Sequence, residues 1–119
     1  MPSEALPIQS LAVVARLYPL VLSGEKTSTI RFGEARIVPG PMRYTCENDT
    51  NRTVTVEVIR CTDMRLSEAA RFLGREADWP RAIMLESMRE HYPGIAWDDI
   101  VQVIEHRAPA ETAPGRNRN

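Results

Sequence analysis

The segment 24–31 reads Gly-Glu-Lys-Thr-Ser-Thr-Ile-Arg and brings an amine, a hydroxyl and a guanidinium close together in sequence. A threonine hydroxyl is a weak nucleophile until a neighbouring base takes its proton. Lys26 can be that base for Thr29 if its pKa falls toward neutrality, because an amine can replace histidine in this task. Arg31 could lower the Lys26 pKa by like-charge repulsion, or bind a carbonyl or an oxyanion. The segment is therefore compatible with acyl transfer.

Lys26 is the only lysine among the 15 basic residues of the chain. Codon bias in a GC-rich genome is the simplest interpretation of most of the arginines. Arginine stays charged at any usable pH and is a poor base, whereas lysine can lose its proton when its surroundings lower its pKa. The single lysine thus indicates amine chemistry at this position. Taken alone, however, such a strand start is more typical of a solvated sheet edge.

The two candidate reactive side chains need a particular backbone arrangement. Residues 27–32 are rich in β-branched side chains and predict a strand. Within a strand, Thr29 and Lys26 would point to opposite faces. We therefore expect Lys26 to lie in the turn before the strand, where Gly24 ends a predicted helix over 17–23.

The remaining elements predict a mainly β domain. Apolar alternation and turn signals predict four further strands, at 11–14, 42–46, 53–61 and 100–105, with 42–46 and 53–61 forming a hairpin. Two helices are expected before the last strand, over 67–73 with Ser67 as its cap and over 80–91 with a cap near Asp78. The buried side of the second helix is predicted at Ile83, Met84 and Met88, with Leu85 near its edge. The natural closure is a small, mainly antiparallel barrel with flanking helices, of class α+β, mainly β.

The composition fits one small domain that needs no covalent staple. The chain has 119 residues, of which 43% are apolar and 26% charged, and we take 11–107 as the domain, after a lead-in over 1–10 and before a disordered tail over 108–119. Two cysteines are too few for a disulfide framework, and Cys46 and Cys61 are predicted core residues. No apolar run approaches the ~20 residues of a membrane helix, and the N-terminus does not resemble a secretory signal. We expect a cytoplasmic protein.

The segment 24–31 resembles the signature of the ASCH family, roughly G-x-K-x-x-E-x-R, whose domains are PUA-like β-barrels. A helix before the segment, an alternating strand after it and the Tyr92-Pro93-Gly94 sequence before a terminal strand fit the same family, over about 11–106. Thr29 stands where the family usually has Glu. This variant is similar to the small bacterial ASCH proteins that act as N4-acetylcytidine amidohydrolases.

The resemblance implies roles for individual residues. Lys26 would be the base, Thr29 the nucleophile and Glu76 the third catalytic residue, although aligning Glu76 needs a one-residue gap and leaves Asp78 open. From their positions, Arg31, Arg16, Tyr18 and Trp79 are candidates to bind a modified cytidine nucleoside or RNA, with Trp79 stacking on a base. No cofactor is implied. His91 and His106 have no ligand-like spacing, so we predict no metal and interpret both as surface or helix-end histidines.

Two other functions remain open. An ASCH domain could be a non-catalytic module that binds RNA or a modified nucleotide, and a ribonuclease is a weaker third possibility because the sequence lacks a well-placed histidine pair. The net charge of −1 argues against binding long nucleic acids by bulk electrostatics, but not against a pocket for a nucleoside or a short RNA. Thr29 separates the hypotheses, because a binder has no need of a hydroxyl beside a lysine.

Overall fold

The computed structural model describes residues 8–109, and over that part of the chain it confirms the predicted order of helices and strands. The elements are β1 (Gln9–Val13), α1 (Tyr18–Ser23), β2 (Ser28–Arg31), β3 (Gly40–Cys46), β4 (Asp49–Arg65), α2 (Leu66–Phe72), α3 (Arg81–His91) and β5 (Ile100–His106). Residues 1–7 of the predicted lead-in and 110–119 of the predicted tail lie outside the described residues.

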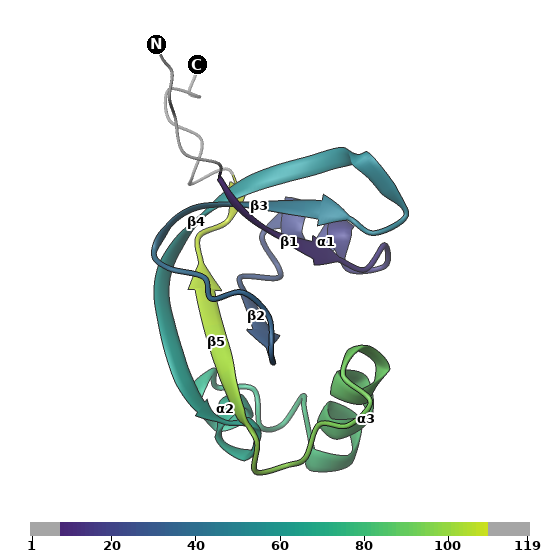
Figure 1. The fold of residues 1–119 in the computed structure, drawn as a ribbon, viewed down its shortest axis with the longest axis vertical. Helices are drawn as coiled ribbons and strands as arrows, with labels where there is room; N and C mark the ends of the chain where they lie inside the picture. The colour runs from purple at the N-terminus through teal and green to yellow at the C-terminus, as the bar shows by residue number, and fades with distance from the viewer. Residues whose placement is uncertain (1–7, 110–119) are drawn as a thin grey trace.

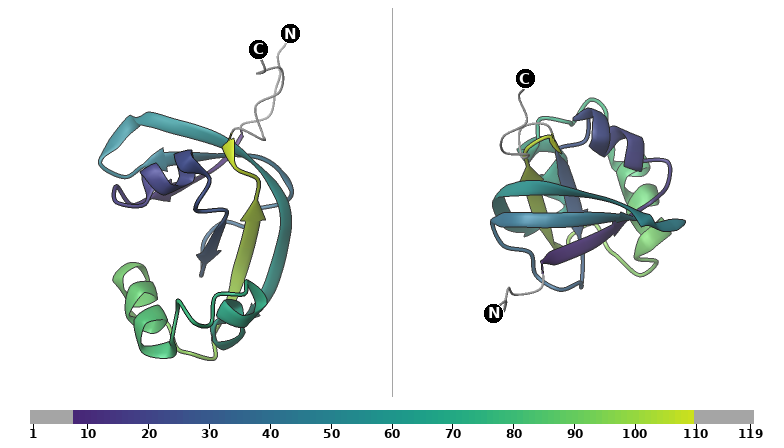
Figure 2. Two further views of the ribbon diagram at one scale, coloured as in Figure 1. Left: turned by 180° about the vertical axis from the view of Figure 1, so that it is seen from behind. Right: turned by 90° about the horizontal axis from the view of Figure 1, so that it is seen from above.

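One five-stranded sheet carries the fold, in the order β1-β3-β4-β5-β2. Strands β1 and β3 run parallel, and the other neighbouring pairs are antiparallel. Strand β4 has 17 residues and pairs first with β3 and then with β5, with a register shift between Val58 and Arg60 where the partner changes. β4 bends through an arc, and the sheet curls into a half-barrel (Figures 1 and 2). The predicted barrel-like α+β class, mainly β and mainly antiparallel, is confirmed.

The alternation of apolar and polar residues in β4 determines which face of the curled sheet is buried. Val56 and Val58 of β4 are buried while Thr55 is exposed, in agreement with the apolar alternation that predicted a strand over 53–61. Met42 and Tyr44 of β3 pack into the same cluster from the partner strand of the hairpin. Burying a side chain of this size contributes about 1.5–3 kcal/mol, so the pattern specifies which face turns inward.

A second cluster lies at the other end of the molecule, where α2 and α3 pack against β5. Met84 and Met88 of α3 belong to the same cluster as Val101 and Val103 of β5. Ile104 of the same strand belongs to the first cluster. Strand β5 therefore has both faces covered and shows four consecutive buried residues instead of alternation.

Several details differ from the sequence predictions. Ser67 is not the cap of α2, because the helix begins one residue earlier, at Leu66, and Glu68 Oε1 accepts from the Arg65 amide instead. Ile83 is 54% exposed and not on the buried side of α3. Strand β1 begins at Gln9, inside the predicted lead-in, because the Gln9 side chain binds both the amide and the carbonyl of Val38.

The predictions for the cysteines and histidines had mixed outcomes. Cys46 is a buried core residue as predicted, and Cys61 is partly buried at the edge of the same cluster. His91 ends α3 and is exposed, as predicted, but His106 is buried at 3% exposure. The surface interpretation of His106 is wrong because β5 continues one residue beyond its predicted end and points this ring inward.

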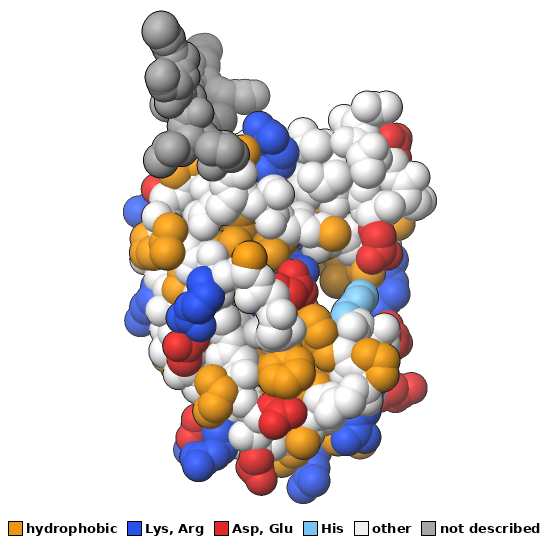
Figure 3. All heavy atoms as spheres, in the orientation of Figure 1, with side chains coloured by type: hydrophobic (Ala, Val, Ile, Leu, Met, Phe, Trp, Pro, Cys, Tyr) orange, Lys and Arg blue, Asp and Glu red, His pale blue; other side chains and the backbone are white. Residues whose placement is uncertain are grey.

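The surface mixes charges of both signs. On the face shown in Figure 3, basic and acidic side chains are interspersed with hydrophobic ones, which agrees with a net charge of −1. No described helix is long and apolar enough to span a membrane.

Candidate active site

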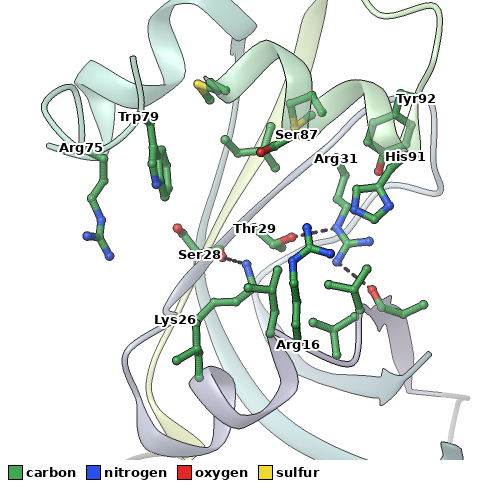
Figure 4. A pocket seen from close by; sticks show the side chains of 18 of the residues that line it. Arg16, Lys26, Ser28, Thr29, Arg31, Arg75, Trp79, Ser87, His91 and Tyr92 are labelled. Atoms are coloured by element: carbon green, nitrogen blue, oxygen red, sulfur yellow. Dashed lines mark hydrogen bonds between the residues drawn. The ribbon is translucent and has the colours of Figure 1, made fainter. Parts of the chain in front are cut away.

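A cavity of about 650 Å³ lies between the N-terminal part of the chain and α3. The loop from β1 into α1 lines one side, α3 lines the other, and the turn before β2 together with β2 itself forms the floor (Figures 1 and 4). Lys26, Thr29 and Arg31 all reach this cavity. The curl of the sheet thus brings the segment 24–31 against a helix about fifty residues away in sequence.

The turn that places Lys26 is built by Gly24. This glycine ends α1 with φ +87°, a left-handed conformation that L side chains rarely adopt, and a Cβ there would meet the Ala108 side chain at 3.0 Å. The Lys26 amide then donates to Leu20 O at 2.9 Å, which folds the turn back on the helix. Lys26 therefore precedes β2, as the sequence predicted, and does not lie within it.

The Lys26 amine points to the floor of the cavity. Its Nζ donates to the backbone oxygen of Ser28 at 2.5 Å, so the amine lies beside the residue that precedes Thr29 (Figure 4). Burial is the main cause that lowers the Lys26 pKa to about 8, and the positive charge of Arg31 acts in the same direction. A lysine with this pKa exchanges protons near neutral pH.

Thr29 is 6% exposed, and its hydroxyl accepts a hydrogen bond from Arg31 Nε at 2.9 Å (Figure 4). Arg31 is itself fixed by two further contacts, with the backbone oxygen of Ala12 at 2.9 Å and with the carboxylate of Glu34 at 3.6 Å. Glu34 also accepts from the Tyr92 hydroxyl, and burial together with this hydrogen bond raises the Tyr92 pKa to about 12. The hydroxyl oxygen of Thr29 therefore already accepts one hydrogen bond from Arg31, whose own position is set by other contacts.

Two of the other residues predicted to bind substrate also line the cavity. Arg16 lies across its mouth and pairs with Glu90 of α3 at 3.1 Å. Trp79 lies on the opposite rim, where the Arg75 guanidinium is 5.4 Å from the centre of its ring (Figure 4). A planar ring with a cation beside it is a suitable surface for a nucleobase.

The structure does not bring the remaining predicted residues to the cavity. Tyr18 is packed in the first hydrophobic cluster, with the Arg52 guanidinium over its ring, because the first turn of α1 faces the core. Glu76 lies on the connection between α2 and α3 with its side chain 66% exposed and paired with Arg71. Asp78, the alternative, is also exposed and pairs with Arg75. Tyr18, Glu76 and Asp78 are all absent from the described lining of the cavity.

Four residues at or behind the site were missed by sequence reasoning. Glu34 and Tyr92 join the cavity wall, and Tyr44 and His106 lie buried behind Thr29. The alternation of residues in β3 indicates that Tyr44 faces the core. Glu34, Tyr92 and His106 come near the site only because the sheet curls, which local sequence does not show. The described residues contain no group of three or more His, Cys, Asp or Glu side chains that could hold a metal ion.

Comparison with known proteins identifies the fold. No protein-family model matches the chain, and no curated protein matches its sequence. The crystal structure of a mutant of ZmASCH from Zymomonas mobilis, however, aligns with 84% of this chain and 68% of its own, with a TM-score of 0.63 at 12% identity. The fold is that of an ASCH domain. At this identity the likeness concerns the fold alone.

Proposed function

We propose that this ASCH-fold protein is an amidohydrolase that removes the acyl group from N4-acetylcytidine-type nucleosides. The observation that carries the proposal is that Lys26, with its pKa lowered to about 8, and the buried Thr29 line the same cavity, and that the Lys26 amine is bonded to the backbone oxygen of Ser28, the residue before Thr29. Perturbed amines in clefts are candidates for proton transfer, and a neighbouring hydroxyl supplies the nucleophile.

The proposed reaction has two stages. In the first, Thr29 Oγ1 loses its proton to neutral Lys26 and attacks the acetyl carbonyl carbon, and the bond to N4 breaks as Lys26 returns the proton to the leaving amine. In the second, neutral Lys26 takes a proton from water as the water oxygen attacks the acetyl carbon, the bond from that carbon to Thr29 Oγ1 breaks, and Lys26 passes the proton to Oγ1 as acetic acid leaves. Arg31 donates to Thr29 Oγ1, the attacking atom, and would stabilise the negative oxygen that develops next to it in both stages.

The size and lining of the cavity support a nucleoside-sized substrate. A volume of about 650 Å³ lies within the range of small-molecule sites. Trp79 would stack on the base, and Arg16 and Arg31 would donate to its polar edge. Glu76, the third residue implied by family resemblance, does not line this cavity, so the proposal depends on Lys26 and Thr29.

The experiment that tests the proposal is incubation of the purified protein with N4-acetylcytidine, followed by chromatography for cytidine. We expect turnover by the wild-type protein and a loss of at least about 10³-fold for Thr29→Ala and Lys26→Ala. An inert wild-type protein, or variants that match it, would reject the amidohydrolase.

Binding of RNA or a modified nucleotide without chemistry is the second candidate. The rim formed by Trp79 and Arg75 favours it, since an aromatic ring beside a cation can hold an unstacked base whether or not a reaction follows. Thr29→Ala should leave the affinity of such a binder nearly unchanged. Fluorescence titration with short single-stranded RNAs would measure it.

A further inference from the structure

Tyr44 and His106 form a buried polar pair directly behind Thr29. Tyr44 is fully buried and His106 is 3% exposed, and neither lines the cavity. Tyr44 Oη and His106 Nε2 are 2.8 Å apart, and the two rings meet edge to face at 5.3 Å. Such a pair is costly to bury unless every donor and acceptor is used.

The hydrogen-bond partners fix the direction of this pair. His106 Nδ1 lies 2.9 Å from the backbone oxygen of Arg107, and a carbonyl oxygen only accepts, so Nδ1 carries the proton. Burial lowers the His106 pKa, which favours the neutral ring. The Nε2 of a neutral ring with its proton on Nδ1 accepts, and Tyr44 must donate to it.

Thr29 continues the same chain of hydrogen bonds. Its hydroxyl oxygen already accepts from Arg31 Nε at 2.9 Å. Burial raises the pKa of Tyr44, and an interaction of the Thr29 side chain with the Tyr44 hydroxyl opposes that rise, which is the effect of a hydroxyl that donates to the phenol oxygen. Because the Tyr44 hydroxyl donates its proton to His106, its oxygen can only accept from Thr29, and the Thr29 hydroxyl is the donor. Each donor from Arg31 through Thr29 and Tyr44 to His106 thus faces an acceptor, and the Thr29 proton points into the protein.

We propose that Tyr44 and His106 give the Thr29 proton a second exit, so that Thr29 can be activated while Lys26 remains an ammonium and protonates the leaving amine. This inference rests on the proposed function, in which Thr29 is the nucleophile. Tyr44 touches the reacting oxygen, and His106 is a positioning residue that acts through it.

The relay conserves protons over the whole cycle. As Thr29 Oγ1 attacks the acetyl carbonyl carbon, its proton passes to Tyr44 Oη while the Tyr44 proton passes to His106 Nε2, which leaves Tyr44 neutral and His106 charged. The bond between the carbonyl carbon and N4 breaks, and N4 takes a proton from the Lys26 ammonium. In deacylation water attacks the acetyl group, its proton returns to Lys26, and His106 returns its proton to Thr29 through Tyr44. Acetic acid and cytidine leave.

The charges around His106 agree with a group that is neutral at rest. Burial and the positive charge of Lys26, from the turn before β2, both lower the pKa of His106 and so disfavour its charged form. Arg31 acts on Tyr44, whose pKa it lowers against the larger effect of burial, which raises it. Strand β4 contributes Glu57, whose backbone oxygen accepts from the amide of Arg107.

The pH dependence of kcat/KM for N4-acetylcytidine separates this relay from Lys26 acting as the only base. With Lys26 alone, kcat/KM should fall roughly tenfold per pH unit below about pH 8, since only neutral Lys26 is competent. With the relay, kcat/KM should stay within about threefold from about pH 8 down to about pH 6.5 and fall only below that. Tyr44→Phe and His106→Gln should convert the flat profile into the roughly tenfold-per-unit decline.

A control variant and a replacement variant separate loss of the relay from loss of stability. Val56→Ala, a core substitution without a polar group, should retain the wild-type profile, which controls for lost stability. If Tyr44→Phe does not fold, His106→Gln replaces it, and the wild-type profile alone still decides. A wild-type profile that already declines below the Lys26 pKa, or variants with an unchanged profile, would overturn the relay.

A reagent that does not need cytosine recognition distinguishes failure of the relay from failure of the proposed substrate. Acetylation of Thr29 by p-nitrophenyl acetate can be followed by mass spectrometry over the same pH range. If N4-acetylcytidine is inert but Thr29 is acetylated with the flat profile, the substrate is wrong and the relay stands. If neither reagent acetylates Thr29, the relay is rejected as well.

Discussion

Arg31 Nη2 in β2 donates to the backbone oxygen of Ala12 in β1 at 2.9 Å. These strands are the two ends of the sheet order, so one side chain bridges the open side of the half-barrel. The same guanidinium also donates to Thr29 and pairs with Glu34. Closure of the sheet and placement of the candidate nucleophile therefore depend on one residue.

Replacing Arg31 should affect both stability and activity. Arg31→Met removes a charge-assisted hydrogen bond to a backbone oxygen, and we expect a loss of about 2 kcal/mol in the free energy of unfolding. Urea denaturation measures it. Arg43→Met, at an exposed arginine of β3, is the control and should change the free energy by less than about 0.5 kcal/mol. Equal effects of both changes would contradict the bridging role.

Thr29→Ser and Thr29→Ala should differ sharply in amidohydrolase assays. Serine keeps a hydroxyl that can accept from Arg31, so kcat should stay within about tenfold of the wild type, whereas alanine should lose at least about 10³-fold. The covalent stage would be marked by an acetyl mass increase at this position after rapid quenching, in the wild type and in Thr29→Ser. If Thr29→Ala kept its activity, Thr29 would not be the nucleophile.

Lys26→Met should stabilise the fold at neutral pH. Burial lowers the Lys26 pKa from 10.5 to about 8, so the unfolded chain binds more protons than the folded one between those values. The cost of burying the charge is therefore full below the folded pKa of about 8 and disappears as the pH rises toward 10.5. We expect Lys26→Met to add about 2 kcal/mol at about pH 7, and less at about pH 9.5, in urea titrations at the two pH values. If the difference in free energy of unfolding between the wild type and Lys26→Met does not change with pH, Lys26 is not desolvated.

Trp79→Ala should weaken substrate binding with little effect on the chemical step. Stacking of one base on an aromatic ring is worth about 1–3 kcal/mol, so KM should rise about tenfold or more while kcat stays within about threefold. Trp79→Phe should recover most of the affinity because it keeps an aromatic face. A fall in kcat without a change in KM would show that Trp79 acts in the chemical step and not in substrate binding.

Glu76→Gln should reduce kcat/KM by less than about threefold, because the carboxylate is 66% exposed and paired with Arg71 outside the cavity. Glu34→Gln is the informative comparison, because Glu34 pairs with Arg31 and accepts a hydrogen bond from Tyr92. This change should reduce kcat/KM more than Glu76→Gln does. A large loss for Glu76→Gln would mean that the connection between α2 and α3 moves toward Thr29 during catalysis.

Local features of the fold could be read from the sequence because neighbouring residues determine them. Gly24 ended the predicted helix and forms the left-handed turn, and Lys26 therefore lies before β2 as expected. The alternation in β4 predicted which face is buried, because its period depends only on strand geometry. The hairpin between β3 and β4 follows from the turn residues between them.

Contacts between distant segments could not be read in this way. Glu76 and Trp79 are close neighbours in the chain, and the sequence could not tell that Trp79 reaches the cavity while Glu76 stays in solvent. Tyr18 seemed available for substrate because it lies near the motif, yet the first turn of α1 faces the core. Which side of a helix turns inward is set by what packs against it.

The order of the elements, the turn before β2 and the presence of a lysine and a threonine next to that turn follow from local sequence. The positions of α3 opposite these residues, of Arg31 on Ala12 and of Tyr44 and His106 behind Thr29 follow from packing between distant segments. The reason is physical. Turns and strand faces depend on backbone preferences of adjacent residues, whereas the depth of a site and the pKa values within it depend on how far the sheet curls and what it buries.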